Sequence, residues 1–148
     1  MKLQTRSFGE IEIAETDILA FDEGLPGFPD DKRFVLLTEE DSPISFLQSV
    51  CDGETSFVVV DMAEMSASYD PHVDESLIES LGEYTPENFI VYNICTIHED
   101  LKKTTVNLKA PIIINAVDKK GKQVVCHNEE YSVKQLLFAP SETEGSPC

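Results

Sequence analysis

Two pairs of residues in this sequence have the types that bind zinc. Cys95 and His98 are separated by two residues, and Cys126 directly precedes His127, so the four side chains offer two thiolates and two imidazoles. Both pairs fall in segments that read as β-strands, where successive side chains point to opposite faces. The members of each pair therefore point apart, and no turn brings all four together. The pattern argues against a zinc site, and we expect no metal or other cofactor.

Groups that could carry out catalysis lack the spacing that known mechanisms need. The sequence has no Gly-x-Ser-x-Gly, His-Glu-x-x-His or Gly-x-x-x-x-Gly-Lys motif. Adjacent carboxylates such as Glu39-Glu40-Asp41 are common, but in a chain this acidic they indicate a solvated loop rather than a general acid–base pair. We therefore expect a protein that is not an enzyme.

The composition is that of an acidic folded protein. The 148 residues include 28 Asp and Glu against 11 Lys and Arg, a formal net charge of −17, which excludes unaided binding of nucleic acid as the main activity. Hydrophobic residues make up 41% of the chain, enough for a core. The charge is −14 over residues 1–75 and −3 over residues 76–148. This asymmetry indicates an acidic face that attracts basic protein surfaces, although solubility explains it equally well.

Location and oligomeric state follow from the same composition. No stretch approaches the roughly 18 to 20 apolar residues of a membrane-spanning helix, and residues 1–9 lack the basic start and apolar stretch of a secretion signal. The four cysteines are dispersed, as is typical of free thiols in a reducing compartment. We expect a cytoplasmic protein that is a monomer when free, because its like charge opposes self-association.

Short strands separated by turn residues dominate the chain. Alternating apolar residues predict strands over 2–7, 10–14, 17–21, 33–38, 44–50, 56–61, 88–98, 104–108, 111–117 and 122–126. The strand at 88–98 is apolar on both faces, as in a strand covered from both sides. Turns are expected at Phe8-Gly9, at Pro26-Gly27 as a type II turn, at 51–54, and at 118–121 with Gly121 in the left-handed conformation.

One helix is predicted between these strands. Asp70 can cap it, Pro71 suits its first position, and Gly82 can end it. An apolar stripe runs along it, made of Val73, Leu77, Ile78 and Leu81. The whole pattern predicts a mainly β fold, a small antiparallel β-barrel-like or sandwich domain with one or two short helices, over residues 1–138. Residues 139–148 are expected to be a disordered tail.

Apolar and amide side chains stand out more than catalytic ones. Leu25 and Phe28 lie on a glycine-hinged loop, where they either plug the end of a barrel or form an exposed contact; the first is the commoner fate of such residues. Gln48 can satisfy backbone groups, and Asn107 and Asn115 are expected to cap strand ends.

A series of short motifs occurs along the chain in a fixed order and spacing: Ile18, Phe21, the run 24–28, Phe34, the run 47–49, the run 57–61, Tyr69, the run 107–115, Gly121, Gln123 and Tyr131. In these motifs the chain resembles the FliW family of flagellar assembly factors. One departure is Met62 after Asp61, where the family usually has proline.

The resemblance implies a non-enzymatic regulator with two protein partners. One is flagellin, and the other is CsrA, a dimeric RNA-binding repressor of flagellin translation. Release from flagellin would free the protein to antagonise CsrA allosterically, which would couple flagellin translation to its secretion and assembly. The implied fold is a small antiparallel β-barrel-like domain.

Six residues are our candidates for binding these partners. We expect Leu25 and Phe28 to act as apolar anchors if they are exposed, and Gln48 and Ser49 to make polar contacts. Asp61 and Glu64 are expected to form part of an acidic rim, which would steer a basic partner towards the apolar centre.

Two other classes of function remain as alternatives. A small-molecule-binding barrel or minor enzyme would need a cavity lined by His98 or His127 together with carboxylates. A nucleic-acid mimic would use ordered rows of carboxylates to compete with RNA, and competition experiments would separate it from an allosteric antagonist.

Overall fold

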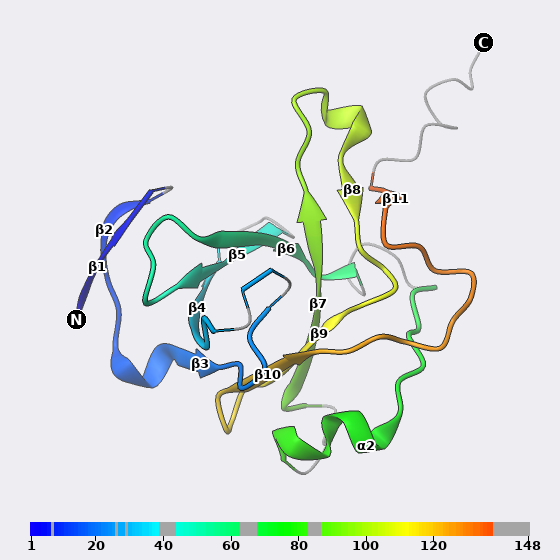
Figure 1. The fold of residues 1–148 in the computed structure, drawn as a ribbon, viewed down its shortest axis with the longest axis horizontal. Coiled ribbons are helices and arrows are strands. Elements are labelled where there is room, and N and C mark those ends of the chain that lie inside the picture. Colours follow the sequence, from blue (N-terminus) through cyan, green and yellow to red (C-terminus); the bar gives the residue numbers. More distant parts are fainter. Residues whose placement is uncertain are drawn as a thin grey trace.

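The structure is a computed structural model, and it describes residues 1–6, 8–25, 27–28, 30–38, 44–62, 68–82 and 87–137. Short strands dominate this part of the chain (Figure 1). Four short helical segments join them: η1 (Glu15–Asp17), α2 (Glu75–Ile78), η2 (Glu79–Leu81) and η3 (Leu101–Lys103). The strands are β1 (Lys2–Thr5), β2 (Gly9–Glu12), β3 (Ile18–Ala20), β4 (Arg33–Thr38), β5 (Ile44–Ser49), β6 (Ser56–Val60), β7 (Phe89–Thr96), β8 (Thr105–Val106), β9 (Ile112–Asn115), β10 (Lys120–Gln123) and β11 (Gln135–Leu136).

Seven of the described strands close into a barrel. Their order is β7-β6-β5-β4-β3-β10-β9, and β9 pairs back with β7. All of these pairs are antiparallel except β3 with β10, which is parallel. Beyond the barrel, β7 and β8 continue as a projecting arm, and β1 and β2 form a separate hairpin at its side (Figure 1). The predicted mainly β fold is confirmed, and its form is a barrel rather than a sandwich.

Alternation along the strands fills the barrel and also leaves apolar residues outside it. On β4, Phe34 and Leu36 belong to the interior cluster, whereas Val35 and Leu37 pack outward against the β1–β2 hairpin. β7 does the same, with Tyr92 inside and Val91 outside, which confirms the prediction of a strand covered on both faces. The barrel therefore has apolar residues packed against its outer surface as well as in its interior core.

The predicted helix begins later than the sequence pattern suggested. The segment that carries the apolar stripe is helical only from Glu75, where α2 starts. The helix continues through η2 and ends at Gly82, whose φ is 108°. The preceding segment is held extended by partners distant in sequence. The backbone N–H of His72 donates to Asn128 Oδ1 at 2.7 Å, and the His72 carbonyl accepts from the N–H of His127 at 2.7 Å. Pro71 is therefore not a first helical residue.

The prediction for the β9–β10 turn was wrong about which residue is left-handed. Lys119 takes this conformation, with φ of 58°, and Gly121 lies within β10. Gly121 is needed for space, because a Cβ atom there would collide with the ring of Phe21, which is fully buried. The glycine lets β10 cross this ring as the barrel closes.

Asn107, which follows β8, and Asn115, the last residue of β9, have the expected structural roles. Asn107 Oδ1 accepts from the N–H of Ala110 at 2.9 Å. Asn115 Oδ1 accepts from the N–H groups of Val117 and Asp118, both at 3.0 Å.

No helix in the described ranges is long and apolar enough to cross a membrane.

Candidate partner-binding surface

The loop after β3 is a tight turn with two glycines in the left-handed region. Gly24 has φ of 72° and Gly27 has φ of 81°, the latter close to the value at the third position of a type II turn. Leu25 and Phe28 bridge the turn with two backbone hydrogen bonds: the N–H of Phe28 donates to Leu25 O at 2.8 Å, and the reverse bond is 3.3 Å. These bonds hold the backbone of the turn in place.

Leu25 and Phe28 lie in opposite environments. Leu25 is 4% exposed and belongs to the barrel core, so it plugs the barrel as the commoner expectation had it. Phe28 is 41% exposed. Its ring packs edge-to-face on Phe57, with the centroids 5.7 Å apart. The loop therefore presents one aromatic side chain, which packs on Phe57 and is otherwise open to solvent.

Three aspartates line a shallow hollow beside Phe28. The hollow has a volume of about 370 Å³. Its lining, which we call the Phe28 surface, consists of Gly27, Phe28, Asp30, Asp31, Cys51 and Asp52.

The carboxylates of this surface favour a basic partner. Hydrogen bonds from the Thr55 hydroxyl and the Glu54 N–H lower the pKa of Asp52 below its ordinary value, so this group is charged at neutral pH. Asp31 Oδ1 is buried and has no hydrogen-bond partner within the described residues. An aromatic ring among carboxylates is a suitable site for a Lys or Arg side chain with its apolar stem.

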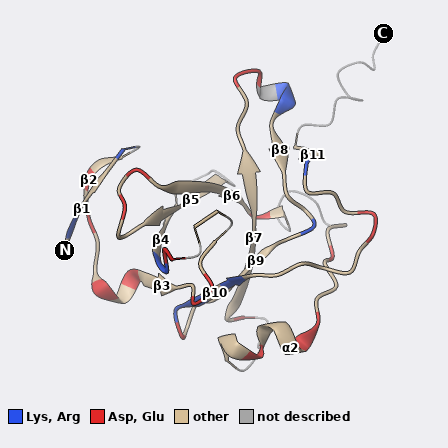
Figure 2. Ribbon diagram, viewed as in Figure 1, with Lys and Arg blue, Asp and Glu red and all other residues tan. Residues whose placement is uncertain are grey.

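Acidic side chains also lie on several other parts of the molecule. Figure 2 shows Asp and Glu on η1, on α2 and in the loops around the barrel. Lys and Arg gather instead along β10 and at η3, where the basic residues are Lys120, Lys122, Lys102 and Lys103. The Phe28 surface is thus one local part of a larger negative field.

Gln48 and Ser49 lie inside the protein and not on this surface. Both are fully buried. The Gln48 amide donates to the carbonyls of Ser49 and Thr55, both at 3.1 Å, and more weakly to those of Asp52 and Gly53. Ser49 Oγ accepts from the N–H of Asp52 at 3.0 Å. Their expected polar contact with a partner is replaced by a structural one, because both hold the β5–β6 turn that carries Asp52.

The two acidic candidates lie away from Phe28 or outside the described residues. Phe57, beneath Phe28, is near the start of β6, and Asp61 follows the end of that strand. Asp61 is four positions along the chain from Phe57, a separation of about 13 Å at the rise of a strand. Glu64 lies outside the described residues. Asp30, Asp31 and Asp52 instead supply the acidic groups that line the hollow with Phe28, and sequence reasoning missed them because they come from two separate loops.

The cysteines and histidines that could bind zinc do not form a metal site in the structure. Cys95 and Cys126 are buried free thiols, and burial raises the pKa of Cys95. His98 and His127 are exposed and line neither the Phe28 hollow nor the larger hollow beside α2. Within the described ranges, no three His, Cys, Asp or Glu residues group so as to hold a metal ion.

Comparison with known proteins agrees with this fold. The model of the FliW protein family matches residues 2–137. The flagellar assembly factor FliW of Thermoanaerobacter pseudethanolicus is 40% identical over 140 residues, which cover 93% of each chain. That of Geobacillus kaustophilus is 40% identical over 138 residues, covering 93% of this chain and 96% of the relative.

A solved structure extends the agreement to three dimensions. A crystal structure of the flagellar assembly factor FliW superposes with a TM-score of 0.86 at 37% identity, covering 94% of this chain and 98% of the other. Barrel, strand order and sequence thus point the same way, and the chain belongs to the FliW family of flagellar assembly factors.

Proposed function

We propose that this protein binds flagellin and, when released from it, binds and allosterically antagonises the RNA-binding repressor CsrA. This would couple flagellin translation to secretion and assembly, without catalysis and in the cytoplasm. Membership of the FliW family supports the assignment to flagellar assembly. The observation that carries the binding role is Phe28, 41% exposed on a tight turn beside carboxylates.

The Phe28 surface suits a repressor of this kind for a physical reason. A protein that grips RNA must carry Lys and Arg on its surface, and such residues are attracted by the net charge of −17 before any contact forms. Once the proteins meet, an aromatic anchor that is already supported loses little side-chain freedom on binding. Charge would thus speed the encounter, and Phe28 would slow dissociation.

Size-exclusion chromatography with light scattering tests the proposal directly. The purified chain should form a stable complex with the flagellin of the same organism and, separately, with its CsrA. Phe28→Ala should weaken the CsrA complex, whereas Val117→Ala, at a 64% exposed apolar residue that does not line this surface, should not. Failure of the unaltered chain to bind either folded partner would refute the proposal.

A titration against RNA tests the mode of antagonism. An allosteric antagonist should raise the apparent dissociation constant of the CsrA–RNA complex to a plateau and form a ternary complex. A nucleic-acid mimic would instead raise that constant without limit as more is added.

A further inference from the structure

A second hollow lies on the outer face of the barrel, and it is separate from the Phe28 surface. On β7 and β9, Val91 lies opposite Ile113, and both point away from the barrel interior. Leu77 and Leu81 of the helical segment pack on this face, but α2 has only four residues and covers part of it. The remaining hollow has a volume of about 750 Å³. We call it the α2 groove, lined chiefly by Val73, Ile78, Phe89, Val91 and Ile113.

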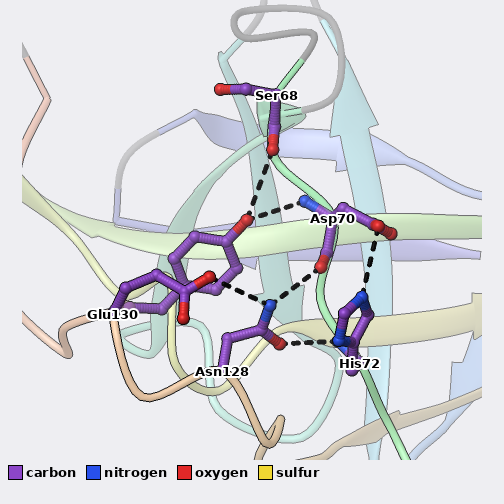
Figure 3. A network of polar contacts seen from close by, with 6 residues as sticks. Ser68, Asp70, His72, Asn128 and Glu130 are labelled. Atoms are coloured by element: carbon purple, nitrogen blue, oxygen red, sulfur yellow. Dashed lines mark hydrogen bonds and ion pairs between the residues drawn. The ribbon is translucent and has the colours of Figure 1, made fainter.

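The wall beside α2 is fixed by a polar network (Figure 3). Asn128 lies at its centre: Oδ1 accepts from the His72 N–H at 2.7 Å, and Nδ2 donates to the Asp70 carbonyl at 3.1 Å. The hydroxyl of Tyr131 accepts from the Asp70 N–H at 2.8 Å and donates to the Ser68 carbonyl at 3.4 Å. This network holds the extended segment that contributes Val73 to the groove.

The other end of the helical segment is fixed as well. Asn115 Nδ2 donates to the Leu81 carbonyl at 2.6 Å. Gly82 follows with φ of 108°, and a Cβ there would lie 2.6 Å from Asp118 Oδ2. One end is thus tied to the segment that follows β10 and the other end to β9. A groove held in this way before a partner arrives lowers the entropy lost on binding.

The rim of the groove is negatively charged. Glu75 and Glu79 both line it, and their side chains are exposed. They are four residues apart along the helical segment, a spacing at which like charges destabilise a helix. Within the described residues neither makes an ion pair. A cation placed between them would relieve this repulsion.

We propose that the α2 groove binds an amphipathic helix of another protein, with an apolar stripe on the floor and Lys or Arg residues at the acidic rim. Apolar grooves beside a helix commonly take such segments. A second copy of this chain is disfavoured because it brings its own charge of −17. The groove shares no lining residue with the Phe28 surface, so this binding is separate from the proposed contacts there.

Nuclear magnetic resonance of the full ¹⁵N-labelled chain tests this proposal. The probe is a synthetic peptide of about 15 residues, with leucines at positions i, i+3, i+4 and i+7 and lysines beside them. It should bind saturably and shift the amide resonances of Val73, Ile78, Val91 and Ile113. A peptide of the same leucines with glutamates in place of the lysines should not bind.

Charge variants locate the binding at the rim. Glu75→Lys with Glu79→Lys should weaken peptide binding about tenfold. Glu15→Lys with Glu99→Lys makes the same change in net charge at exposed positions elsewhere, and should alter binding less than about threefold. If the first double variant fails to fold, Glu75→Gln with Glu79→Gln replaces it.

Several outcomes would overturn the proposal for the α2 groove. They would leave the proposed binding of flagellin and CsrA unaffected, because that binding is measured in a separate experiment. The outcomes are equal binding of the two peptides, equal affinity in the rim and control variants, and peptide shifts confined to other residues. A concentration-dependent dimer that shifts the groove amides would assign the groove to a second copy. Binding of small apolar molecules there without peptide binding would assign it to a small ligand.

Discussion

Single residues in the loop after β3 differ in role although they are close in sequence. Leu25 and Phe28 are both large and apolar, and two backbone hydrogen bonds join them. Leu25 fills the barrel end, whereas the ring of Phe28 lies on Phe57 with one side open to solvent. Their stability effects should therefore differ.

Alanine substitutions at the two positions measure this difference. Leu25→Ala should lower the free energy of unfolding by about 2–5 kcal/mol, because it leaves a cavity in the core. Phe28→Ala should lower it by only about 1–2 kcal/mol, since it removes one edge-to-face contact and partial burial. Urea denaturation gives both values. Equal losses would place Phe28 in the core and remove it as a contact residue.

Gln48 is the second residue with a measurable structural role. Its amide donates to carbonyls of the β5–β6 turn from a fully buried position. Gln48→Ala leaves these buried carbonyls without their donor and should cost about 1–3 kcal/mol of unfolding free energy in urea titration. The control Gln135→Ala, at an exposed residue, should stay within about 0.5 kcal/mol. A neutral Gln48→Ala would show that the turn does not depend on this amide.

At the scale of elements, the β5–β6 turn should respond to pH through Asp52. The pKa of this carboxylate is lowered by the Thr55 hydroxyl first and the Glu54 N–H second. A lowered folded-state pKa stabilises the protein above the unfolded value and loses this effect as pH falls through the folded one. Asp52→Asn should thus destabilise at pH about 7, and the difference should shrink below the ordinary carboxyl pKa of about 3.9.

Urea titrations of the Asp52 variant at several pH values check this expectation. In a Thr55→Val background the donor is gone, so the pH dependence of the Asp52→Asn effect should become smaller. A cost that is the same at every pH would mean that shape, and not charge, accounts for the substitution.

Closure of the barrel depends on how β10 crosses Phe21. Gly121→Ala would place a methyl group against this buried ring and should cost about 1–3 kcal/mol of unfolding free energy. Replacing Phe21 by Leu makes room, so Gly121→Ala should cost less in that background than alone. Thermal or urea unfolding of the four proteins measures the coupling. Additive effects would show that the ring and the glycine do not oppose each other.

At the scale of the whole molecule, the net charge of −17 should act on association rates. The association rate constant with CsrA should fall steeply as salt rises, because ions screen the long-range attraction. The dissociation rate constant should change much less, since it depends on close contacts such as Phe28. Stopped-flow or surface-binding kinetics at low and high salt check both. Association rates that are unchanged by salt would contradict steering.

Much of the fold was predictable because its signals are local. The strand at 33–38 agrees with β4 residue for residue, and alternation predicted the β1–β2 hairpin, although Gly9, expected in its turn, begins β2 and pairs with Thr5. The prediction failed at Asp70–Asp74, where propensity favoured a helix but bonds to Asn128 and Tyr131, more than 50 residues away, keep the chain extended. Likewise, no local signal at Gly121 indicated the ring of Phe21.

The candidate site was less predictable for the same reason. The sequence by itself determined the β class, the acidic charge and the loop that carries Leu25 and Phe28, since alternation, charge and turn residues can be read from neighbouring residues. The family followed separately, from the resemblance of the motifs in their order and spacing. Only the tertiary structure decided that Leu25 is buried and Phe28 open, that Gln48 and Ser49 lie inside, and that Asp30 and Asp52 meet beside Phe28. It also decided that α2 leaves a groove on β7 and β9, because barrel closure sets which apolar face stays uncovered.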